Sequence, residues 1–419
     1  MKGFSLFNTL VAFIVIGCST IKKNTTLDHH KISIKKEIAM SKQEKEAYGE
    51  TLTTSGVLQY ECKGNIHTIK GLNIQNNGAV KIIDCNILDS KIKAKTLSIV
   101  YTDNYIKKGL EDIHISNSSF MNVEKLTIQS NFSKSEFNGS FLISKLSTKK
   151  IRELRIENVD QIINSQFVNA NIVKISCPEK FTSHGDAIIN QSLSLLKNSE
   201  FSSIDKLEIN NCQVDGIESY SGNFTYLPGK ASLNNRILRS KIYASKFVNL
   251  SKLSTLQNTS IETKNLNIKG LESYDCIIQD SKLLVGNQLQ IEYSNIVRSN
   301  LKSKQIVAQD FHLINNATIN ASSLVLEGEL ANIKQSKFQV KHSIHIKDVE
   351  SLSESTLFSK NIIMIQDFTK ISNVDASARV VLVQNGRSLA STNIDFVERL
   401  IIKEVEKEEE VAKDQVSGL

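Results

Sequence analysis

The chain has 419 residues, of which 40% are hydrophobic, 6% are aromatic and none is Trp, and its formal charge is +7. That charge is a mild basic bias over so long a chain, and no run of Lys and Arg is dense enough to predict binding to nucleic acid. The length allows two or three ordinary domains or one long solenoid. Ile, Leu and Val alternate with Ser, Asn and Thr, which favours strands and tight turns over helices.

The chain starts with a short apolar segment. Lys2 precedes the run FSLFNTLVAFIVIG over 4–17, which is too short for a comfortable transmembrane helix and is typical of the core of a signal peptide. The run leads into the tetrapeptide VIGC, which ends at Cys18. We therefore predict a signal peptide over 1–17. The alternative is an ordinary secretory signal, or an uncleaved anchor, with a chance cysteine.

The end of this segment resembles the lipobox of bacterial lipoproteins, with an aliphatic residue three places before the cysteine and a small residue directly before it. The resemblance implies that Cys18 is diacylated on its sulfur and becomes the mature N-terminus. The acyl chains would then hold the protein on a membrane, at about 0.8 kcal/mol per buried CH₂ group. Ser19 follows the cysteine where Asp would be the other option, which in a Gram-negative cell implies sorting to the outer membrane, on its periplasmic or its surface face.

Residues 18–56 are polar and rich in Lys, Thr, Ser and Glu, with little apolar periodicity. This composition predicts a flexible tether that holds the rest of the protein away from the membrane, with room for a short helix over 35–48. From residue 57 onward the pattern is typical of strands.

One pattern then recurs along the chain and is most regular over 278–394. An apolar residue, which we call the lead residue, is followed three places later by a small residue and five places later by another apolar one. The step between copies is 18 or 19 residues, a period that predicts a stacked-repeat architecture. The late copies are Ile278/Ser281/Leu283, Ile296/Ser299/Leu301, Ile314/Ala317/Ile319, Ile333/Ser336/Phe338, Leu352/Ser355/Leu357, Ile371/Val374/Ala376 and Leu389/Thr392/Ile394.

The same pattern is present earlier with less even spacing. Steps of 28 to 41 residues between some copies predict loop insertions or degenerate rungs, above all over 101–111, 176–187 and 215–234. The early copies are Ile87/Ser90/Ile92, Ile115/Ser118/Phe120, Phe132/Ser135/Phe137, Ile162/Ser165/Phe167, Leu196/Ser199/Phe201, Ile237/Ser240/Ile242 and Leu256/Thr259/Ile261.

A second stretch of alternating apolar and polar residues follows the copies, as at 97–99 and 289–291. In a strand such alternation turns one side chain inward and the next outward. We therefore predict an all-β fold, a single long right-handed parallel β-solenoid over 57–405 with three short strands in each rung of about 18–19 residues. The small residue would leave room for a tight corner, and its hydroxyl would bond along the stack. Residues 398–405 would form a closing strand and 406–419 a charged tail.

The period of 18–19 residues resembles bacterial parallel β-solenoids, either bactofilin-like proteins or the repeats of filamentous-haemagglutinin-type adhesins. The BspA-like leucine-rich repeat is a rival, because ISNSSF at 115–120 and IINSQF at 162–167 are similar to it. That family has a period of about 23 residues, with a Cys and a Pro in each repeat, and the present chain lacks both features. Both resemblances imply an exposed binding surface, and neither carries over a catalytic residue.

Five cysteines follow Cys18, and an exported chain can join cysteines in disulfides. Cys62 and Cys85 are the pair that we would test first for a disulfide. No CxxC motif occurs, and Cys85 and Cys212 each stand three places after an apolar residue, where the repeat has its small residue. We therefore favour buried thiols for the set of five, which is Cys62, Cys85, Cys177, Cys212 and Cys276.

The polar columns beside the small residue do not predict an active site. General acid–base chemistry needs paired carboxylates on neighbouring rungs, and the columns two and four places after the lead residue are mixed in character. We interpret both as solvated faces, and we find no phosphate-binding, metal or cofactor motif in the sequence. The first column reads Asp280, Arg298, Asn316, Gln335, Glu354, Asn373 and Ser391.

We therefore expect a lipid-anchored, exported, non-catalytic protein, an adhesin or a scaffold, with no cofactor. Its partners would be the membrane, through the N-terminal lipid, and a glycan or protein ligand, but not nucleic acid. Two alternatives stay open. A carbohydrate-active β-helix enzyme would need a cleft with two or more carboxylates within about 10 Å of each other, and a self-assembling structural protein would have uncapped ends. The sequence leaves the oligomeric state open.

Overall fold

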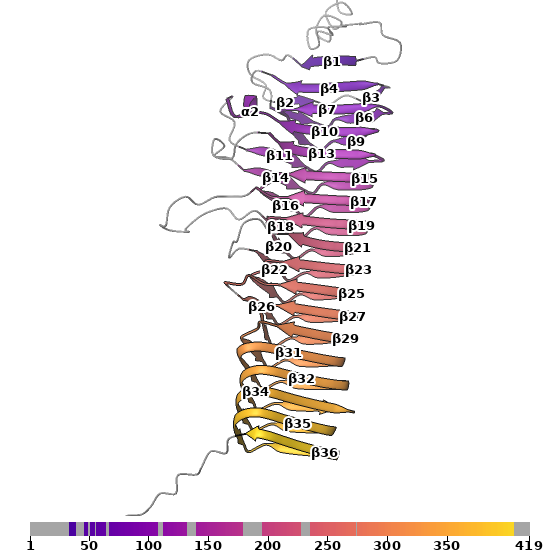
Figure 1. Ribbon diagram of the computed structural model, residues 1–419. Helices are drawn as coiled ribbons and strands as arrows, with labels where there is room; N and C mark the ends of the chain where they lie inside the picture. Colours follow the sequence, from indigo (N-terminus) through magenta and orange to yellow (C-terminus); the bar gives the residue numbers. More distant parts are fainter. Residues whose placement is uncertain are drawn as a thin grey trace, which may run out of the picture. The chain divides into compact units, whose positions relative to one another are not determined.

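The structure is a computed structural model, which describes residues 33–38, 46–48, 51–54, 56–63, 67–107, 112–131, 140–178, 195–227, 235–273 and 275–405. These residues lie almost entirely in strands, and the helix found among them is the short α2 (Asp103–Lys107). Within each part of the chain, strands pair in parallel with strands one turn further along (Figure 1). The predicted all-β fold, a parallel β-solenoid with rungs of about 18–19 residues, is confirmed. Its right-handedness stays a prediction.

The chain forms two compact units, Met1–Ser245 and Lys246–Leu419. In each unit a turn consists of three strand segments, which we call faces A, B and C. Face A contains the alternating stretches such as 289–291, face B contains lead residues such as Ile278, and face C contains the second apolar residue of each copy, such as Leu283. A leucine-rich repeat would instead combine one strand with a helical segment in each repeat.

In the first unit, the long strands after β14 turn the corner from face C to face A. Face A contains β1 (Ser33–Ile38), β4 (Val57–Cys62), β7 (Ala79–Ile83), β10 (Thr96–Tyr101), β13 (Lys125–Ser130), β15 (Ser147–Glu157), β17 (Gln166–Ser176), β19 (Glu200–Asn210) and β21 (Glu218–Leu227). Face B contains β2 (Glu46–Tyr48), β5 (Thr68–Lys70), β8 (Asn86–Leu88), β11 (Ile113–Ser116), β14 (Phe141–Ser144), β16 (Gln161–Ile163), β18 (Leu195–Lys197), β20 (Gln213–Asp215) and β22 (Arg236–Leu238). Face C also contains β3 (Thr51–Thr54), β6 (Asn73–Asn76), β9 (Lys91–Lys93) and β12 (Ser119–Met121).

The boundary between the units falls within β23 (Lys241–Ser251). In the second unit the long strands are β25 (Ser260–Lys269), β27 (Lys282–Glu292), β29 (Asn300–Gln309), β31 (Thr318–Lys334), β32 (Lys337–Ser353), β34 (Ile362–Ser372), β35 (Asp375–Ala390) and β36 (Asn393–Val405). The short strands are β24 (Thr255–Gln257), β26 (Cys276–Gln279), β28 (Ser294–Val297) and β30 (Leu313–Asn315) on face B, and β33 (Thr356–Ser359) on face C. The predicted strand at 398–405 is part of β36.

The strands begin earlier than the sequence predicts. β1, β2 and β3 lie within the segment 18–56, which we expected to be a tether, and they pair in parallel with β4, β5 and β6. The helix expected over 35–48 is wrong for the residues of β1 and β2. Polar side chains dominate these strands, so their composition hides the pairing that the backbone makes with the next rung. Residues 1–17, Cys18 and the tail 406–419 lie outside the described residues.

The predicted insertions have mixed outcomes. The helix α2 interrupts the strands within 101–111, as expected, and most of 176–187 lies outside the described residues. The insertion at 215–234 is wrong for 218–227, because these residues form β21, which pairs with β19. The copy Phe132/Ser135/Phe137 also lies outside the described residues. The rung at this level is led by Ile143, which pairs with Ile115 and Ile162.

Three rungs reverse the order of small and large residues, and the sequence pattern therefore missed two of them. After a lead residue these rungs carry Leu146 then Thr148, Ile217 then Ser219, and Val374 then Ala376, all buried. The larger residue occupies the corner and the smaller one lies on face C, so that the two together keep a similar volume. Close-packed interiors tolerate swaps of this kind because total volume is conserved.

Candidate functional site

The repeat residues named from the sequence lie in the core. The lead residues stack on one another along face B, and their partners stack along face C. All are fully buried and carry only apolar side chains, so their role is packing. The set is Ile278, Leu283, Ile296, Leu301, Ile333 and Phe338.

Ser281, Ser299 and Ser336 belong to a column of buried hydroxyls at the corner between faces B and C. Each hydroxyl oxygen accepts a hydrogen bond from a backbone N–H one turn earlier. The donors include Ser281 N to Ser299 Oγ (3.1 Å) and Ala317 N to Ser336 Oγ (3.1 Å). Each hydroxyl also donates to the carbonyl two residues before it, as Ser336 Oγ does to Lys334 O (2.8 Å). The expected tight corner with bonded hydroxyls is thus confirmed.

The residue directly before each hydroxyl adopts a left-handed backbone conformation. Asp280 has φ 49°, Arg298 has φ 46° and Asn316 has φ 52°, and the N–H of Asp280 donates to Val297 O one turn later (3.1 Å). Asn and Asp accept this conformation more readily than other residues with a Cβ atom. The column that we interpreted as a solvated face is therefore defined first by its backbone. The sequence signal was the enrichment of Asn and Asp in this column.

Two members of this column form an ion pair across neighbouring rungs. Nε and Nη2 of Arg298 each donate to one carboxylate oxygen of Asp280, both at 2.8 Å. The hydrogen bonds from Arg298 lower the pKa of Asp280 and raise the pKa of Arg298. Both side chains are solvent-exposed, and a pair of this kind orients its members without making a strong contribution to stability.

Two disulfides join neighbouring rungs of the first unit. Cys62 is bonded to Cys85, the pair that we singled out from the sequence, and Cys177 is bonded to Cys212. The interpretation of these four residues as thiols is therefore wrong. Cys276 is a free, buried cysteine, and burial raises the pKa of its thiol to about 12. Spacing could not give the pairing, because two cysteines 35 residues apart meet only after an insertion is looped out.

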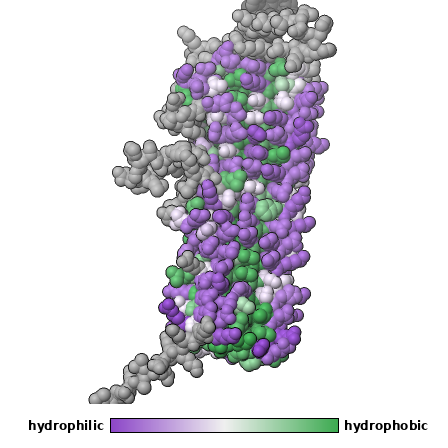
Figure 2. Space-filling view, viewed as in Figure 1, coloured by the Kyte–Doolittle hydropathy of each residue, from purple (hydrophilic) through white to green (hydrophobic). Residues whose placement is uncertain are grey.

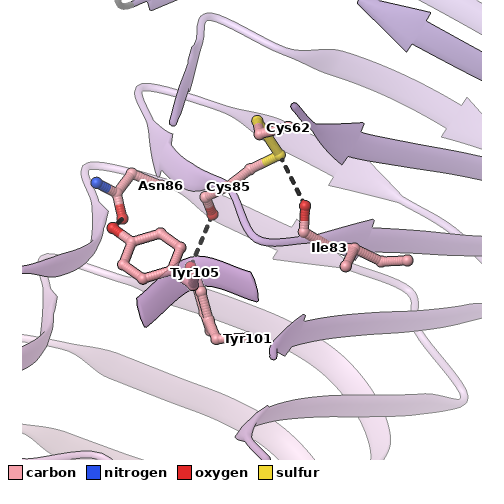
Figure 3. Close-up of a disulfide and its surroundings, with 6 residues drawn as sticks. All are labelled: Cys62, Ile83, Cys85, Asn86, Tyr101 and Tyr105. Carbon is pink, nitrogen blue, oxygen red and sulfur yellow. Dashed lines mark hydrogen bonds between the residues drawn. A yellow bond between two sulfur atoms is a disulfide. The ribbon is translucent and has the colours of Figure 1, made fainter. Parts of the chain in front are cut away.

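A buried tyrosine supports each disulfide. Tyr101 Oη donates to Cys85 O (2.8 Å), and Tyr226 Oη donates to Cys212 O (2.8 Å). Figure 3 shows the first of these sites, where Tyr105 lies beside Tyr101 and its hydroxyl reaches Asn86 Oδ1 (3.1 Å). Burial raises the pKa of Tyr101 well above its ordinary value, so its hydroxyl keeps its proton. These groups are structural, since each polar atom serves a neighbouring rung.

A cavity of about 570 Å³ lies at the corner between faces A and B in the second unit. Its acidic lining is Asp310, Glu327, Asp348 and Asp367, which we call the acidic corner. Asp310, Asp348 and Asp367 have φ between 51° and 57°, so they occupy a second column of left-handed residues. We did not consider this column in the sequence. Its signal was an Asp four places after the first inward residue of the alternating stretch, as at 306–310, 344–348 and 363–367.

The charges of the acidic corner are partly compensated. Lys347 Nζ lies 3.1 Å from Asp348 Oδ2 and 3.7 Å from Glu327 Oε1, and the hydrogen bond to Asp348 raises the pKa of the lysine. Asn385 Nδ2 donates to Asp367 Oδ1 (2.8 Å). Leu330 projects into this surroundings with 67% of its surface exposed and with φ 56°, a conformation that costs a residue with a Cβ atom about 1–2 kcal/mol.

Face A of the second unit has a feature of a different kind. Its central outward column is polar at Asn267 and Gln290 and then changes to the apolar stripe, which we define as Val307, Val325, Met364, Leu382 and Ile401, with His345 between Val325 and Met364. The register places these residues directly above one another on successive rungs. Hydrophobic residues gather over the strands of the second unit in Figure 2.

The strands that carry the apolar stripe lose their alternation. The sequence reads Ile-Ile-Met-Ile at 362–365 and Val-Val-Leu-Val at 380–383, so that outward positions are as apolar as inward ones. The inward residues are buried, whereas Met364 and Leu382 are only half-buried. Continuous apolar runs are typical of strands that are covered on both faces. The sequence signal for this surface was thus the loss of the period-two pattern.

The comparisons with known proteins give no assignment: the chain matches no protein-family model, no curated protein and no solved structure. Over the residues that the structure describes, no helix has the length and apolar character needed to cross a membrane. In the same residues, no three or more His, Cys, Asp or Glu side chains are arranged to hold a metal ion.

Proposed function

We propose that this protein is an exported, lipid-anchored, non-catalytic scaffold or adhesin. The observation that carries the proposal is the pair of disulfides, Cys62–Cys85 and Cys177–Cys212, in the first unit. Disulfides persist in oxidising compartments and are rare in the cytosol. They support the export that the apolar segment at 4–17 predicts. The lipid on Cys18 would then fix the solenoid to a bacterial membrane, most simply the outer membrane.

The role as a scaffold or adhesin follows from where the polar groups lie. Along the described rungs, the columns beside the hydroxyls serve the backbone and one another, as in the pair of Asp280 with Arg298. What the solenoid offers to a partner is repeated outward columns of side chains and the apolar stripe. The ligand of such a surface is a glycan or another protein. The argument from fold to role is one of analogy, so the experiments decide it.

Two experiments test the anchor and the exposure. The Cys18→Ala variant should leave the membrane fraction and incorporate no labelled fatty acid, whereas Cys276→Ala, which changes a buried core thiol, should stay on the membrane. Protease added to intact cells should then cleave the wild-type protein if it faces the exterior. A protein that is protected in intact cells and cleaved after permeabilisation would exclude the adhesin and leave a periplasmic scaffold. A Cys18→Ala variant that stays labelled and membrane-bound would contradict the anchor.

The ligand class is tested with the purified protein on a glycan array and by pull-down with envelope proteins. Binding that needs the solenoid and saturates would support the adhesin. A protein that binds neither glycan nor protein at any accessible concentration would contradict the display of a ligand-binding surface.

A second candidate, a carbohydrate-active enzyme, is favoured by one observation, the acidic corner. Asp348 and Asp367 lie on neighbouring rungs, which are about 5 Å apart, and this spacing is near that of the carboxylates in retaining glycosidases. Release of reducing ends from a neutral or amino-sugar polysaccharide, lost in Asp348→Asn and retained in Asp395→Asn, would establish it. Unchanged polysaccharide, or equal release by Asp348→Asn, would exclude it.

A further inference from the structure

We propose that the apolar stripe is the interface of a homodimer, in which two copies pack face A against face A with their solenoid axes in opposite directions. The two copies would be related by a two-fold axis that runs along the strand direction. This inference goes beyond the proposed function, because neither the anchor nor a ligand requires a second copy.

The fold itself does not require an apolar stripe. Asn267 and Gln290 occupy the same outward column two and one rungs before Val307, and the inward residues on either side of them are buried as they are in the stripe. A polar side chain at this position is therefore compatible with the core. The change to Val, Met, Leu and Ile over six rungs implies that something covers these strands from outside.

The chain's own C-terminal segment is a poor cover for the stripe. Residues 406–419 read EKEEEVAKDQVSGL, with five carboxylates against two lysines, and placing such a segment on apolar side chains would remove charges from water without partners. A second copy brings a surface of matching character instead.

The two-fold axis along the strands gives a complementary set of contacts. It places Val307 opposite Ile401 of the second copy, Val325 opposite Leu382, and His345 opposite Met364. Small residues of the first rungs thus meet larger ones of the last rungs, which suits two faces packed about 10 Å apart.

The columns that flank the apolar stripe fit the same arrangement. On the side that leads to face B, Gln309 meets Lys403, Glu327 meets Gln384, and Lys347 meets Gln366, so that no two like charges are opposed. On the other side, Ser343 meets Ile362 and Ser323 meets Val380. The positions of these residues follow from the strand register.

The other in-plane two-fold axis, along the solenoid axis, is disfavoured. It would oppose each rung to itself, which sets His345 against His345 and Arg399 against Lys403. Like charges across an interface oppose association and thereby select the other orientation.

The area of the contact predicts a reversible dimer. Five residues of strand at 3.3 Å each, over six rungs spaced 4.8 Å apart, cover roughly 480 Å² per copy. The two copies together bury about 1,000 Å², which is near the lower limit for a specific interface. We therefore expect a dissociation constant of about 10 μM, with both monomer and dimer present in this range.

Sedimentation equilibrium of the full chain in a mild detergent tests the dimer. The wild-type protein should pass from monomer to dimer between about 1 and 200 μM. Leu382→Glu, which places a charge against Val325, should raise the dissociation constant at least 10-fold. Gln290→Glu is the matched control, since it adds the same charge to the same column outside the stripe, and it should dimerise as the wild type does. Circular dichroism would verify that both variants fold. A wild-type protein that stays monomeric, or a Leu382→Glu variant that dimerises unchanged, would overturn the proposal.

Engineered cysteines test the orientation. A Val325→Cys/Leu382→Cys double variant should form a covalent dimer on oxidation, because each copy presents one cysteine to the other. Neither single variant should do so, since each new thiol would face Leu382 or Val325. A covalent dimer from the Met364→Cys single variant would place like residues opposite each other and overturn the opposed arrangement.

Discussion

Each turn of the solenoid contains two adjacent corner residues with different requirements. The first, such as Asn316 or Asp280, needs a left-handed backbone, and the second, such as Ser336, needs a small side chain whose hydroxyl bridges two rungs. Arg298 and Gln335 occupy the first position with a backbone that costs more for such residues, so the column looks mixed in the sequence. The small residue was predictable because its size shows directly. The left-handed residue was not, because several side chains occupy it.

Ser336 provides the test at this scale. Ser336→Ala removes the acceptor of the buried N–H of Ala317, and we expect the free energy of unfolding to fall by about 1–3 kcal/mol. Ser336→Leu should cost a further amount of about 1–3 kcal/mol by overpacking. Urea unfolding followed by circular dichroism measures both. Ala317→Ser is the matched control, since it adds a hydroxyl to the same column, and it should leave stability unchanged or slightly higher. Equal stability of Ser336→Ala and the wild type would mean that the hydroxyl column contributes nothing.

At the scale of a rung, the packed volume is fixed while its distribution is not. The regular rungs place a small residue at the corner and a large one on face C, and Val374 with Ala376 shows the reverse order. The lead residues and the alternating stretches could be predicted because their period is a property of position. The rungs at Ile143 and Val214 could not, because the search required a small residue before a large one. The disulfide of Cys177 with Cys212 was hidden for a related reason, since an insertion obscured which rungs are neighbours.

The reversed rung gives a double-mutant test. Val374→Ser alone should leave a cavity and Ala376→Leu alone should overpack face C, each with a loss of about 1–3 kcal/mol in unfolding free energy. The double variant restores the regular order and should recover most of the loss, giving a coupling energy of at least about 1 kcal/mol. Losses that simply add would show that the two sites do not share one volume.

For the whole molecule, the two units differ in how they are held together. Both disulfides lie in the first unit, whereas the described rungs of the second unit depend on packing and hydrogen bonds between neighbours. In stacked repeats stability is close to a sum of rung and nearest-neighbour contributions, so a bond between two rungs acts locally. The compartment was predictable from residues 4–18 and five later cysteines. The apolar stripe was missed because alternation was treated as a rule instead of a variable.

The locality of the disulfides can be measured by hydrogen exchange. Replacing Cys62 and Cys85 by Ala should lower local stability by about 2–4 kcal/mol and speed amide exchange in β4, β7 and β10. Exchange in β27 to β35 of the second unit should not change. Cys276→Ala is the control without loss of a disulfide. Faster exchange throughout both units in the Cys62→Ala/Cys85→Ala variant would contradict a solenoid of nearest-neighbour contacts.

The disulfides also determine how the protein would respond to force. A pull on the N-terminal end acts along the solenoid axis, in line with the hydrogen bonds between rungs, so rungs would peel away one after another. The bond between Cys62 and Cys85 excludes the 23 residues between them from extension, which is roughly 80 Å of chain. Each disulfide therefore works as a mechanical stop that ends unravelling after a set length. A molecule that is held by its N-terminus and stressed at its far end would thus keep most of its solenoid folded.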